Sequence, residues 1–395
     1  MTLEHPTALQ ADSALIAYAL RGLSRCWVPE RGRYSHIYRL DAAESATDSP
    51  NLSVPESDAF YTLNVLLGLS RLGQSEPGSE ARGELPDLRQ TPDLRQTYEG
   101  CCREAGNPRF RPYAHGMALW VGARLGLAPP ELVLDRVLAV AADRHALARL
   151  TAQDVGMLIS GTTAMNVADG GIWRPVTETL VEHLRQRYHN PATGLFYNQA
   201  TGPRRWFSSF ASQVYSTLAL YHYGEAFGAD WAIGIANDTA ARLIALQGSR
   251  GEWPWFYYVP GGRVVDFYEI YSVHQHGMAP AFLHHAVAHG VSGARDALVR
   301  GFGWLFGDNE MGVSMLRPAE GMFYRSQVRA GELDTAWPRL RRGLGNAVLR
   351  RDDDVERHQG LVLRQECRSY ELGWILWSFG GRSDYPELTD RPEFA

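Results

Sequence analysis

The sequence predicts an all-α chain that folds as one domain over residues 1–395, a closed α/α toroid (barrel) of about six helical hairpins with short β-hairpin loops on one rim. Three observations carry this prediction. Apolar segments rich in small residues recur along the chain, amphipathic segments alternate with them, and the connections repeat an aromatic residue, a proline and a glycine turn. Such hairpins can close into a ring or stack into an open solenoid. The irregular repeat lengths, with long loops on one side, favour the ring.

The apolar segments are the predicted inner helices of the ring. A helix that is apolar nearly all round is buried on both sides, and its glycines let neighbouring helices approach closely. Six segments have this character: 61–73 (YTLNVLLGLSRLG), 114–126 (AHGMALWVGARLG), 154–164 (DVGMLISGTTA), 211–224 (ASQVYSTLALYHYG), 276–290 (HGMAPAFLHHAVAHG) and 370–381 (YELGWILWSFGG).

The amphipathic segments are the predicted outer partners of these helices. They span residues 11–26, 88–105, 131–150, 175–188, 232–246, 293–306 and 335–350. The outer set therefore exceeds the inner set by one. We expect one of the last two outer segments to be either an extra helix or the partner of an inner helix near residues 309–316.

Three connections share a turn signature. Residues 27–34 (WVPERGRY), 188–196 (YHNPATGLF) and 258–264 (YVPGGRV) each place an aromatic residue before a proline and then a glycine turn, after which the chain runs extended. These connections predict short β-hairpins on one rim.

Composition restricts the class of partner. A net charge of −5 argues against a nucleic-acid or anionic-membrane partner, because both require a clustered basic face. Four cysteines are too few to cross-link a chain of this length, and no CxxC occurs. No signal-peptide pattern and no long apolar run is found. We expect a cytoplasmic chain without a membrane span or a cofactor, acting on a small-molecule or oligosaccharide substrate.

Residues 247–280 combine aromatic rings with ionisable groups. This stretch carries Glu252, Asp266, Glu269, His274 and His276 among tryptophans, tyrosines and phenylalanines. A buried charge without a partner is costly, so a segment that only filled a core would not need these groups. We interpret the stretch as one wall of a binding cavity. The alternative is a surface hairpin whose aromatic rings pack inward while its charges stay in water.

A second cluster opens the last predicted inner helix. Glu366, Arg368 and Glu371 lie there, about 100 residues after the first stretch. Closing the ring brings late hairpins side by side, so we predict that His274 or His276 lies within one side-chain length of Glu366, Arg368 or Glu371. Such proximity would make the charge of the histidine sensitive to the carboxylates, as an acid/base role requires.

The candidate site follows from these two stretches. The candidate catalytic residues are Glu252, Asp266, Glu269, His274, His276, Glu366 and Glu371, and the candidate substrate-binding residues are Trp255, Tyr258, Tyr268, Tyr271, Arg325, Arg368 and Tyr370. Two carboxyl groups can cleave a glycosidic bond, and a base facing an acid can epimerise a sugar carbon. For each acid the alternative is a salt bridge that only holds loops in place. No third ligand accompanies the two histidines at a diagnostic spacing, so we expect no metal.

The pattern of segments resembles the six-hairpin α/α toroids. These include glycosidases, unsaturated-uronyl hydrolases, polysaccharide lyases and the N-acylglucosamine 2-epimerase family. The resemblance covers nearly the whole chain at the level of architecture. It implies a saccharide in the mouth of the toroid, contacted by Trp and Tyr and by Glu, Asp, His and Arg from inner-helix starts and loops.

A shorter motif resembles a different family. Gln247, Gly251 and Trp253 match the Q-x-x-x-G-x-W motif of squalene-hopene-type terpene cyclases, whose domains are also α/α barrels. In that family the motif is structural and ties an outer helix to the next turn. The resemblance implies that Trp253 is buried beside Gln247 and closes a helix-to-loop turn.

The charge of the predicted rim decides between the functions. A polyene cyclase needs an apolar aromatic chamber, whereas many charged and imidazole groups suit a hydroxyl-rich or uronate substrate. We therefore expect a glycan-processing enzyme of the glycoside hydrolase or sugar epimerase type. A terpene or prenyl cyclase and a non-catalytic glycan-binding protein are the alternatives.

Overall fold

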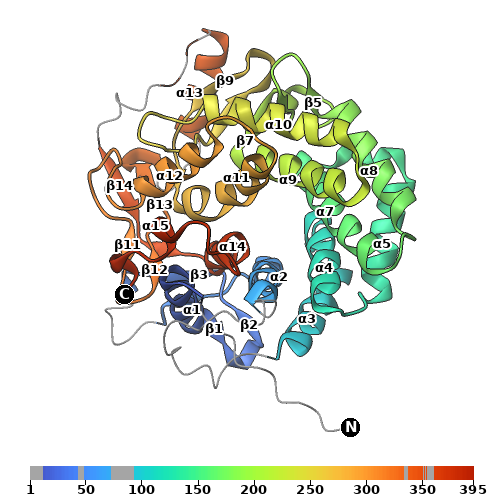
Figure 1. Cartoon of the computed structure of the whole chain (residues 1–395), viewed down its shortest axis with the longest axis horizontal. Helices are drawn as coiled ribbons and strands as arrows, with labels where there is room; N and C mark the ends of the chain where they lie inside the picture. Colours follow the sequence, from blue (N-terminus) through green and yellow to red (C-terminus); the bar gives the residue numbers. More distant parts are fainter. Residues whose placement is uncertain are drawn as a thin grey trace.

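The computed structural model describes residues 12–42, 49–72, 93–332, 337–349, 351, 353 and 360–395. Helices dominate this part of the chain and form two concentric rings (Figure 1). The inner ring contains α2 (Pro55–Leu72), α4 (Pro112–Leu125), α7 (Ala152–Ala168), α9 (Phe210–Phe227), α11 (Ala279–Ala288) with the preceding π-helical turn η7 (His274–Met278), and α14 (Ser369–Phe379). All six predicted inner segments are therefore confirmed as helical.

The inner helices make a complete circuit. Each packs against the next in chain order, and α14 packs against both η7 and α2, so the last hairpin lies beside the first. The glycines explain how the helices come so close. A Cβ atom on Gly161 of α7 would lie 2.2 Å from the carbonyl oxygen of Gly116 in α4, and one on Gly68 of α2 would lie 2.3 Å from that of Gly373 in α14. Only glycine permits these contacts.

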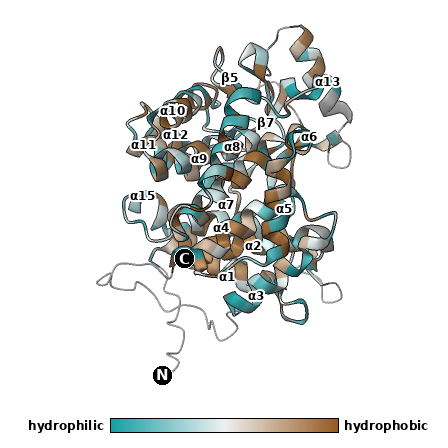
Figure 2. Ribbon diagram, turned by 90° about the vertical axis from the view of Figure 1, so that its right-hand side faces the viewer, coloured by the Kyte–Doolittle hydropathy of each residue, from teal (hydrophilic) through white to brown (hydrophobic). Residues whose placement is uncertain are grey.

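The outer ring supplies one partner for each inner helix. It contains α1 (Ala14–Cys26), α3 (Leu94–Cys102), α5 (Glu131–Ala142) with α6 (Arg144–Arg149), α8 (Arg174–Arg187), α10 (Asp230–Ala245) and α12 (Ala294–Trp304). The predicted segment 131–150 is thus two helices, because the Asp143 side chain accepts a hydrogen bond from His145 N and caps the second one. Figure 2 shows that the inner helix α2 is more hydrophobic than the outer helix α3.

The seventh outer segment forms an extra helix. This helix, α13 (Trp337–Val348), packs against strand β9 (Arg263–Asp266). Residues 309–316 form turns that lead into a short strand, so no inner helix lies there. Residues 11, 73, 88–92, 335–336 and 350 of the predicted helices lie outside the described residues.

The described strands all lie in connections that lead from an outer helix to the start of the next inner helix. They are β1 (Trp27–Val28), β2 (Arg33–Tyr34), β3 (Ile37–Arg39), β4 (Asn51–Leu52), β5 (His189–Asn190), β6 (Leu195–Phe196), β7 (Phe207–Ser209), β8 (Phe256–Tyr258), β9, β10 (Ile270–Tyr271), β11 (Leu316–Arg317), β12 (Met322–Phe323), β13 (Ser326–Arg329), β14 (Leu361–Arg364) and β15 (Glu366–Cys367). The three predicted hairpins are the antiparallel pairs β1–β2, β5–β6 and β8–β9. The prediction of short strands on one rim is confirmed.

The turn at residues 247–253 follows the outer helix α10 and is hydrogen-bonded to the next outer helix, α12. The Gln247 side-chain amide donates to Gly251 O at 2.8 Å and to Ala297 O in α12 at 2.9 Å. Trp253 is fully buried and stacks on Phe210 at 5.3 Å between ring centroids. Gly251 has φ +92°, which favours glycine. The structural role implied by the motif is therefore observed.

A candidate active site at the starts of the inner helices

Two sheets on the loop-bearing rim bring distant charged residues together. In one, β13 pairs with both β10 and β14, so Tyr271 lies opposite Ser326 and Ser326 lies opposite Arg364. In the other, β15 pairs with β3 directly before α14 begins. The charged residues that meet here are called the rim cluster: Glu269, Arg325, Arg364, Glu366, Arg368 and Glu371.

Glu269 is held ionised by its neighbours in the first sheet. Arg364 binds both carboxylate oxygens, with Nε–Oε1 at 2.8 Å and Nη2–Oε2 at 3.3 Å. The hydroxyl groups of Ser326 and Tyr271 also donate to this carboxylate. Burial would raise the pKa of Glu269, but the hydrogen bonds from Arg364 and Ser326 and the charge of Arg325 outweigh it and lower the pKa.

Glu371 has the opposite environment. It lies in the first turn of α14, is fully buried, and neither carboxyl oxygen has a hydrogen-bond partner within the described chain. Burial raises the pKa of Glu371 to about 8, against the opposing charge of Arg325. At neutral pH this side chain is therefore mostly protonated. Two carboxyl groups whose environments move their pKa values apart are suited to the roles of acid and base.

Glu366 links two arginines of the cluster. Its Oε1 lies 3.0 Å from Arg325 Nη1 and 3.1 Å from Arg368 Nη2. Arg368 Nη1 in turn donates to the hydroxyl of Tyr61, in the inner helix α2, at 3.1 Å. Glu366, Arg368 and Tyr61 are only partly buried, so this side of the cluster is reached by solvent.

Aromatic rings surround the charges. Trp255 lies parallel to the imidazole of His274, with ring centroids 6.1 Å apart, and its centroid is 5.1 Å from that of Tyr271. The guanidinium carbon of Arg325 lies 5.0 Å from the centroid of the Tyr271 ring. Tyr370 contacts Tyr61 at 4.5 Å. Aromatic faces of this kind stack on sugar rings and contact cations.

His274 begins the π-helical turn that opens the inner helix α11. Burial and the nearby charge of Arg325 lower its pKa to about 3, so the imidazole is neutral. Arg325 contacts Glu366, so it connects His274 with the start of α14. The two predicted stretches thus share Arg325, whose charge acts both on His274 and on Glu371.

Other predicted site residues lie elsewhere. His276 is buried in the core against Phe323, with ring centroids 4.5 Å apart, because the helical turn points it away from His274. Tyr258, in β8, packs against Phe207 and Arg263 rather than against the rim cluster. The structure therefore does not bring these two residues to the rim cluster.

Asp266 and Tyr268 belong to a separate ionic network. Arg329 Nη1 binds Asp266 Oδ1 at 2.9 Å and Glu332 Oε2 at 3.2 Å, and its guanidinium lies over the Tyr268 ring. Arg342 of α13 binds Glu332 at 2.6 Å. For Asp266, the salt-bridge alternative is the one observed, since this network holds α13 on the sheet.

Glu252 is buried in the turn that also contains Trp253. Its carboxylate accepts from Arg250 N at 2.9 Å. Burial and the charge of Glu310 raise its pKa to about 7. Glu252 is thus a perturbed acid that lies in a structural turn, apart from the contacts of the rim cluster.

Sequence reasoning missed three residues of this region. Arg364 binds Glu269, Tyr61 binds Arg368, and His36 stacks on Tyr61 at 4.3 Å. Tyr61 could have been found, because it begins a predicted inner segment. Arg364 and His36 carry no such signal, since strand pairing alone brings them here.

Two negative findings concern the described part of the chain. No group of three or more His, Cys, Asp and Glu side chains there is arranged to hold a metal ion. None of its helices has both the length and the apolar character needed to cross a membrane.

Comparison with known proteins gives similarity in structure alone. No protein-family model matches the sequence, and no curated protein matches it. Among solved structures, cellobiose 2-epimerase from Bacillus thermoamylovorans B4167 is similar with a TM-score of 0.61 and 10% identity, over 92% of this chain and 96% of that one.

Two further structures are similar over nearly their whole length. An unsaturated glucuronyl hydrolase specific for heparin has a TM-score of 0.56 at 10% identity, covering 95% and 96% of the two chains. An inactive α-1,6-mannanase variant of Salegentibacter sp. HEL1_6, in complex with an α-1,6-linked mannotetraose, has a TM-score of 0.55 at 13% identity, covering 94% and 99%. These similarities establish the α/α toroid fold.

Proposed function

We propose that the protein is a glycan-processing enzyme of the hydrolase or epimerase type, with its active site at the rim cluster. The observation that carries this proposal is the pair of buried glutamates whose environments oppose each other. Glu371 has no hydrogen-bond partner among the described residues and has a raised pKa, whereas Glu269 is bound by Arg364 and has a lowered pKa. The similar toroids act on, or are bound to, saccharides, which agrees with this proposal.

The rim cluster supplies the parts that such chemistry needs. Protonated Glu371 can donate a proton to a departing sugar oxygen or to a sugar carbon, and ionised Glu269 can accept one from water or from the substrate. Trp255 and Tyr61 offer faces for a sugar ring. Arg368, partly exposed, is suited to bind a substrate carboxylate, and this favours a polar or uronate-containing saccharide.

The experiment is a substrate panel with two matched variants. Wild type, Glu371→Gln and Glu252→Gln are assayed on uronate-containing oligosaccharides, neutral oligosaccharides and prenyl diphosphates. Glu252 is a matched control because it is also fully buried and its pKa is also raised, yet it lies in the structural turn. We expect turnover of a saccharide that falls by about 10²–10⁴-fold in Glu371→Gln and stays near wild type in Glu252→Gln.

Each other outcome contradicts part of the proposal. Turnover of a prenyl diphosphate would identify a cyclase, and saccharide binding without turnover would identify a glycan-binding protein. Equal losses of turnover in Glu371→Gln and Glu252→Gln would contradict a catalytic role of the rim cluster.

A further inference from the structure

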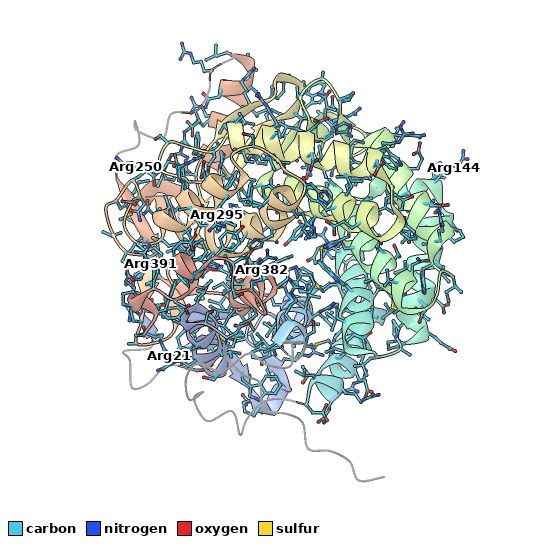
Figure 3. The ribbon with its side chains drawn as sticks, in the orientation of Figure 1. Arg21, Arg144, Arg250, Arg295, Arg382 and Arg391 are labelled. Carbon is cyan, nitrogen blue, oxygen red and sulfur yellow. The ribbon has the colours of Figure 1, made fainter. Side chains whose placement is uncertain are left out.

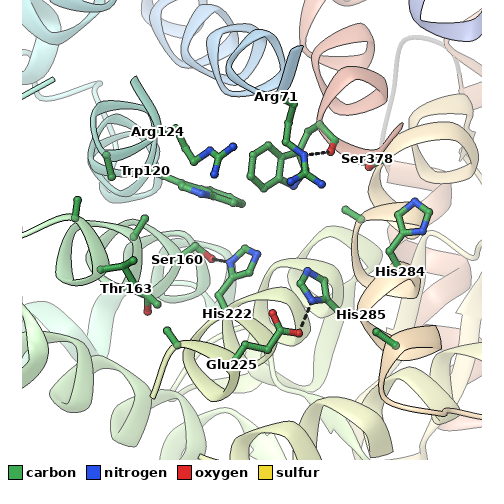
Figure 4. Close-up of a pocket in the computed structure, with 18 of the residues that line it drawn as sticks. Arg71, Trp120, Arg124, Ser160, Thr163, His222, Glu225, His284, His285 and Ser378 are labelled. Carbon is green, nitrogen blue, oxygen red and sulfur yellow. Dashed lines mark hydrogen bonds and ion pairs between the residues drawn. The ribbon is translucent and has the colours of Figure 1, made fainter. Parts of the chain in front are cut away.

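The toroid has a second opening, at the opposite ends of the inner helices. A cavity of about 780 Å³ lies there, and each of the six inner helices contributes at least one lining residue. This C-terminal cavity is lined by Arg71, Trp120, Arg124, Ser160, Thr163, His222, Glu225, His284, His285, Trp377 and Arg382, among others (Figure 4). It contains no residue of the rim cluster. Its volume is in the range of small-molecule sites.

The described wall of the cavity carries several arginines. Arg71 of α2, Arg124 of α4 and Arg382 after α14 line it, together with one glutamate among the described lining residues. Figure 3 shows Arg382 near the middle of the ring, whereas Arg144 and Arg250 lie on its outer side. Arg382 is paired with Asp384, with Nη2–Oδ2 at 2.9 Å. Arg71 makes no ion pair within the described chain, and its Nε donates to Trp377 O at 3.3 Å.

Glu225, which lines the cavity, is hydrogen-bonded to two histidines. Glu225 Oε1 lies 2.7 Å from His285 Nδ1 and 3.0 Å from His289 Nε2. Figure 4 shows this pair across the cavity from Arg71 and Arg124. The ion-pair contacts of Glu225 are therefore with histidines, and none within the described chain is with Arg71.

Capping of a helix end does not account for Arg71. Carbonyl groups at helix C-termini attract cations, and the contact from Arg71 to Trp377 O is of this kind. A guanidinium has five N–H donors, however, so one such contact leaves Arg71 able to bind an anion. Arg71 also lies near Arg124 and Arg382, and burial together with these like charges lowers its pKa to about 10. A bound anion would relieve this repulsion.

Polar groups without partners point to a ligand with hydroxyl groups. The Thr163 hydroxyl is buried and has no hydrogen-bond partner in the described chain, and neither ring nitrogen of His284 has one in ordinary geometry. Trp120 and Trp377 meet edge to face at 4.9 Å and supply apolar surface. Buried polar groups are normally hydrogen-bonded, so the cavity offers unused bonds beside its arginines.

We propose that the C-terminal cavity is a second ligand site, which binds a sugar-sized anion bearing a carboxylate or a phosphate. Arg71 and Arg124 bind the anionic group, Trp120 and Trp377 contact the ring, and Thr163 and Ser160 bind hydroxyl groups. The site does not depend on the function proposed for the rim cluster.

Titration calorimetry tests this site. Glucuronate, glucose 6-phosphate, inorganic phosphate and glucose are titrated at constant ionic strength into wild type and into Arg71→Gln, Arg124→Gln and Arg136→Gln. Arg136 is the matched control, since it is an exposed arginine on the outer helix α5. We expect binding of glucuronate or glucose 6-phosphate, none of glucose, and at least a tenfold loss of affinity in Arg71→Gln and Arg124→Gln with none in Arg136→Gln.

Two further variants keep the test decisive. Ala164→Phe fills the cavity from α7 without removing a charge, so it should abolish binding even if an arginine variant fails to fold. Glu371→Gln should leave this binding unchanged, which would show that the C-terminal cavity binds its ligand independently of the rim cluster. Binding of inorganic phosphate alone would overturn the sugar-sized ligand. Absence of anion binding to wild type, or binding that survives both Arg124→Gln and Ala164→Phe, would overturn the site.

Discussion

Glu269 and Glu371 show how environment gives one side-chain type two protonation states. Arg364 and two hydroxyl groups surround the first, and the second is buried with no hydrogen-bond partner among the described residues. If both take part in catalysis, activity should rise and fall with pH. It should be lost as the pH falls and Glu269 becomes protonated, and lost again as the pH rises through about 8 and Glu371 ionises. The dependence of kcat/KM on pH measures this, and a profile without a loss near pH 8 would contradict the role of Glu371.

Glu371 should also make stability fall with pH. Its pKa is raised in the folded state, from an ordinary value of 4.5 to about 8. The folded chain therefore holds the proton more tightly than the unfolded chain, and the stability that this contributes is present below pH 4.5 and is lost as the pH rises to about 8. Urea unfolding at several pH values should show a smaller decline for Glu371→Gln than for wild type. The pKa of Glu252 is also raised, so Glu252 makes the stability of both proteins decline with pH. The contribution of Glu371 is therefore the difference between the declines of wild type and Glu371→Gln.

Sequence alone could place part of this site. Glu366, Arg368 and Glu371 are at a predicted inner-helix start, and inner-helix starts meet at one mouth. It could not separate Glu269 from Asp266, because strand register decides which arginine each acid meets. Pairing of β13 with β14 puts Arg364 on Glu269, 95 residues away in the chain, while Arg329 of the same β13 strand reaches Asp266.

The elements were predictable where their signal is local. The inner segments and the three aromatic-proline-glycine hairpins each carry their pattern within about 15 residues. The pairing of β15 with β3, which sets Glu366 opposite Arg39, joins opposite ends of the chain and leaves no local pattern. The position of α13 likewise depends on ionic contacts from Arg342 to Glu332 and Asp266.

The turn after α10 makes a testable prediction at this scale. Trp253 is fully buried against Phe210 and Phe282, and Gln247 ties the same turn to α12. Trp253→Ala leaves a cavity of the size of an indole, so it should lower the free energy of unfolding by about 3–5 kcal/mol. Urea denaturation measures the loss. A stable Trp253→Ala protein with weakened ligand binding would move this residue from the scaffold to the site.

Two junctions of the ring, α4 with α7 and α2 with α14, depend on backbone contacts between glycines. Gly161→Ala places a methyl group 2.2 Å from Gly116 O, and backbone atoms cannot move aside cheaply. We expect the free energy of unfolding to fall by about 1–3 kcal/mol or more. Gly234 is the matched control, since it is exposed in the outer helix α10 with no atom within 4 Å of an added Cβ. Gly234→Ala should be neutral or stabilise by up to about 1 kcal/mol. Equal effects in thermal unfolding would contradict the proposed role of the close contacts.

The order of the helices in the circuit has a consequence for biosynthesis. The neighbour that completes the ring beside α2 is α14, and α2 ends at Leu72 whereas α14 begins at Ser369. A ribosome that adds about 5–20 residues per second needs on the order of 15–60 s to make the intervening chain. Throughout that time the face of α2 around Gly68 lacks its final neighbour, so the nascent protein is an open arc with an uncovered apolar edge. The ring can close only after α14 has been made, and a chaperone that protects this edge would act before that point.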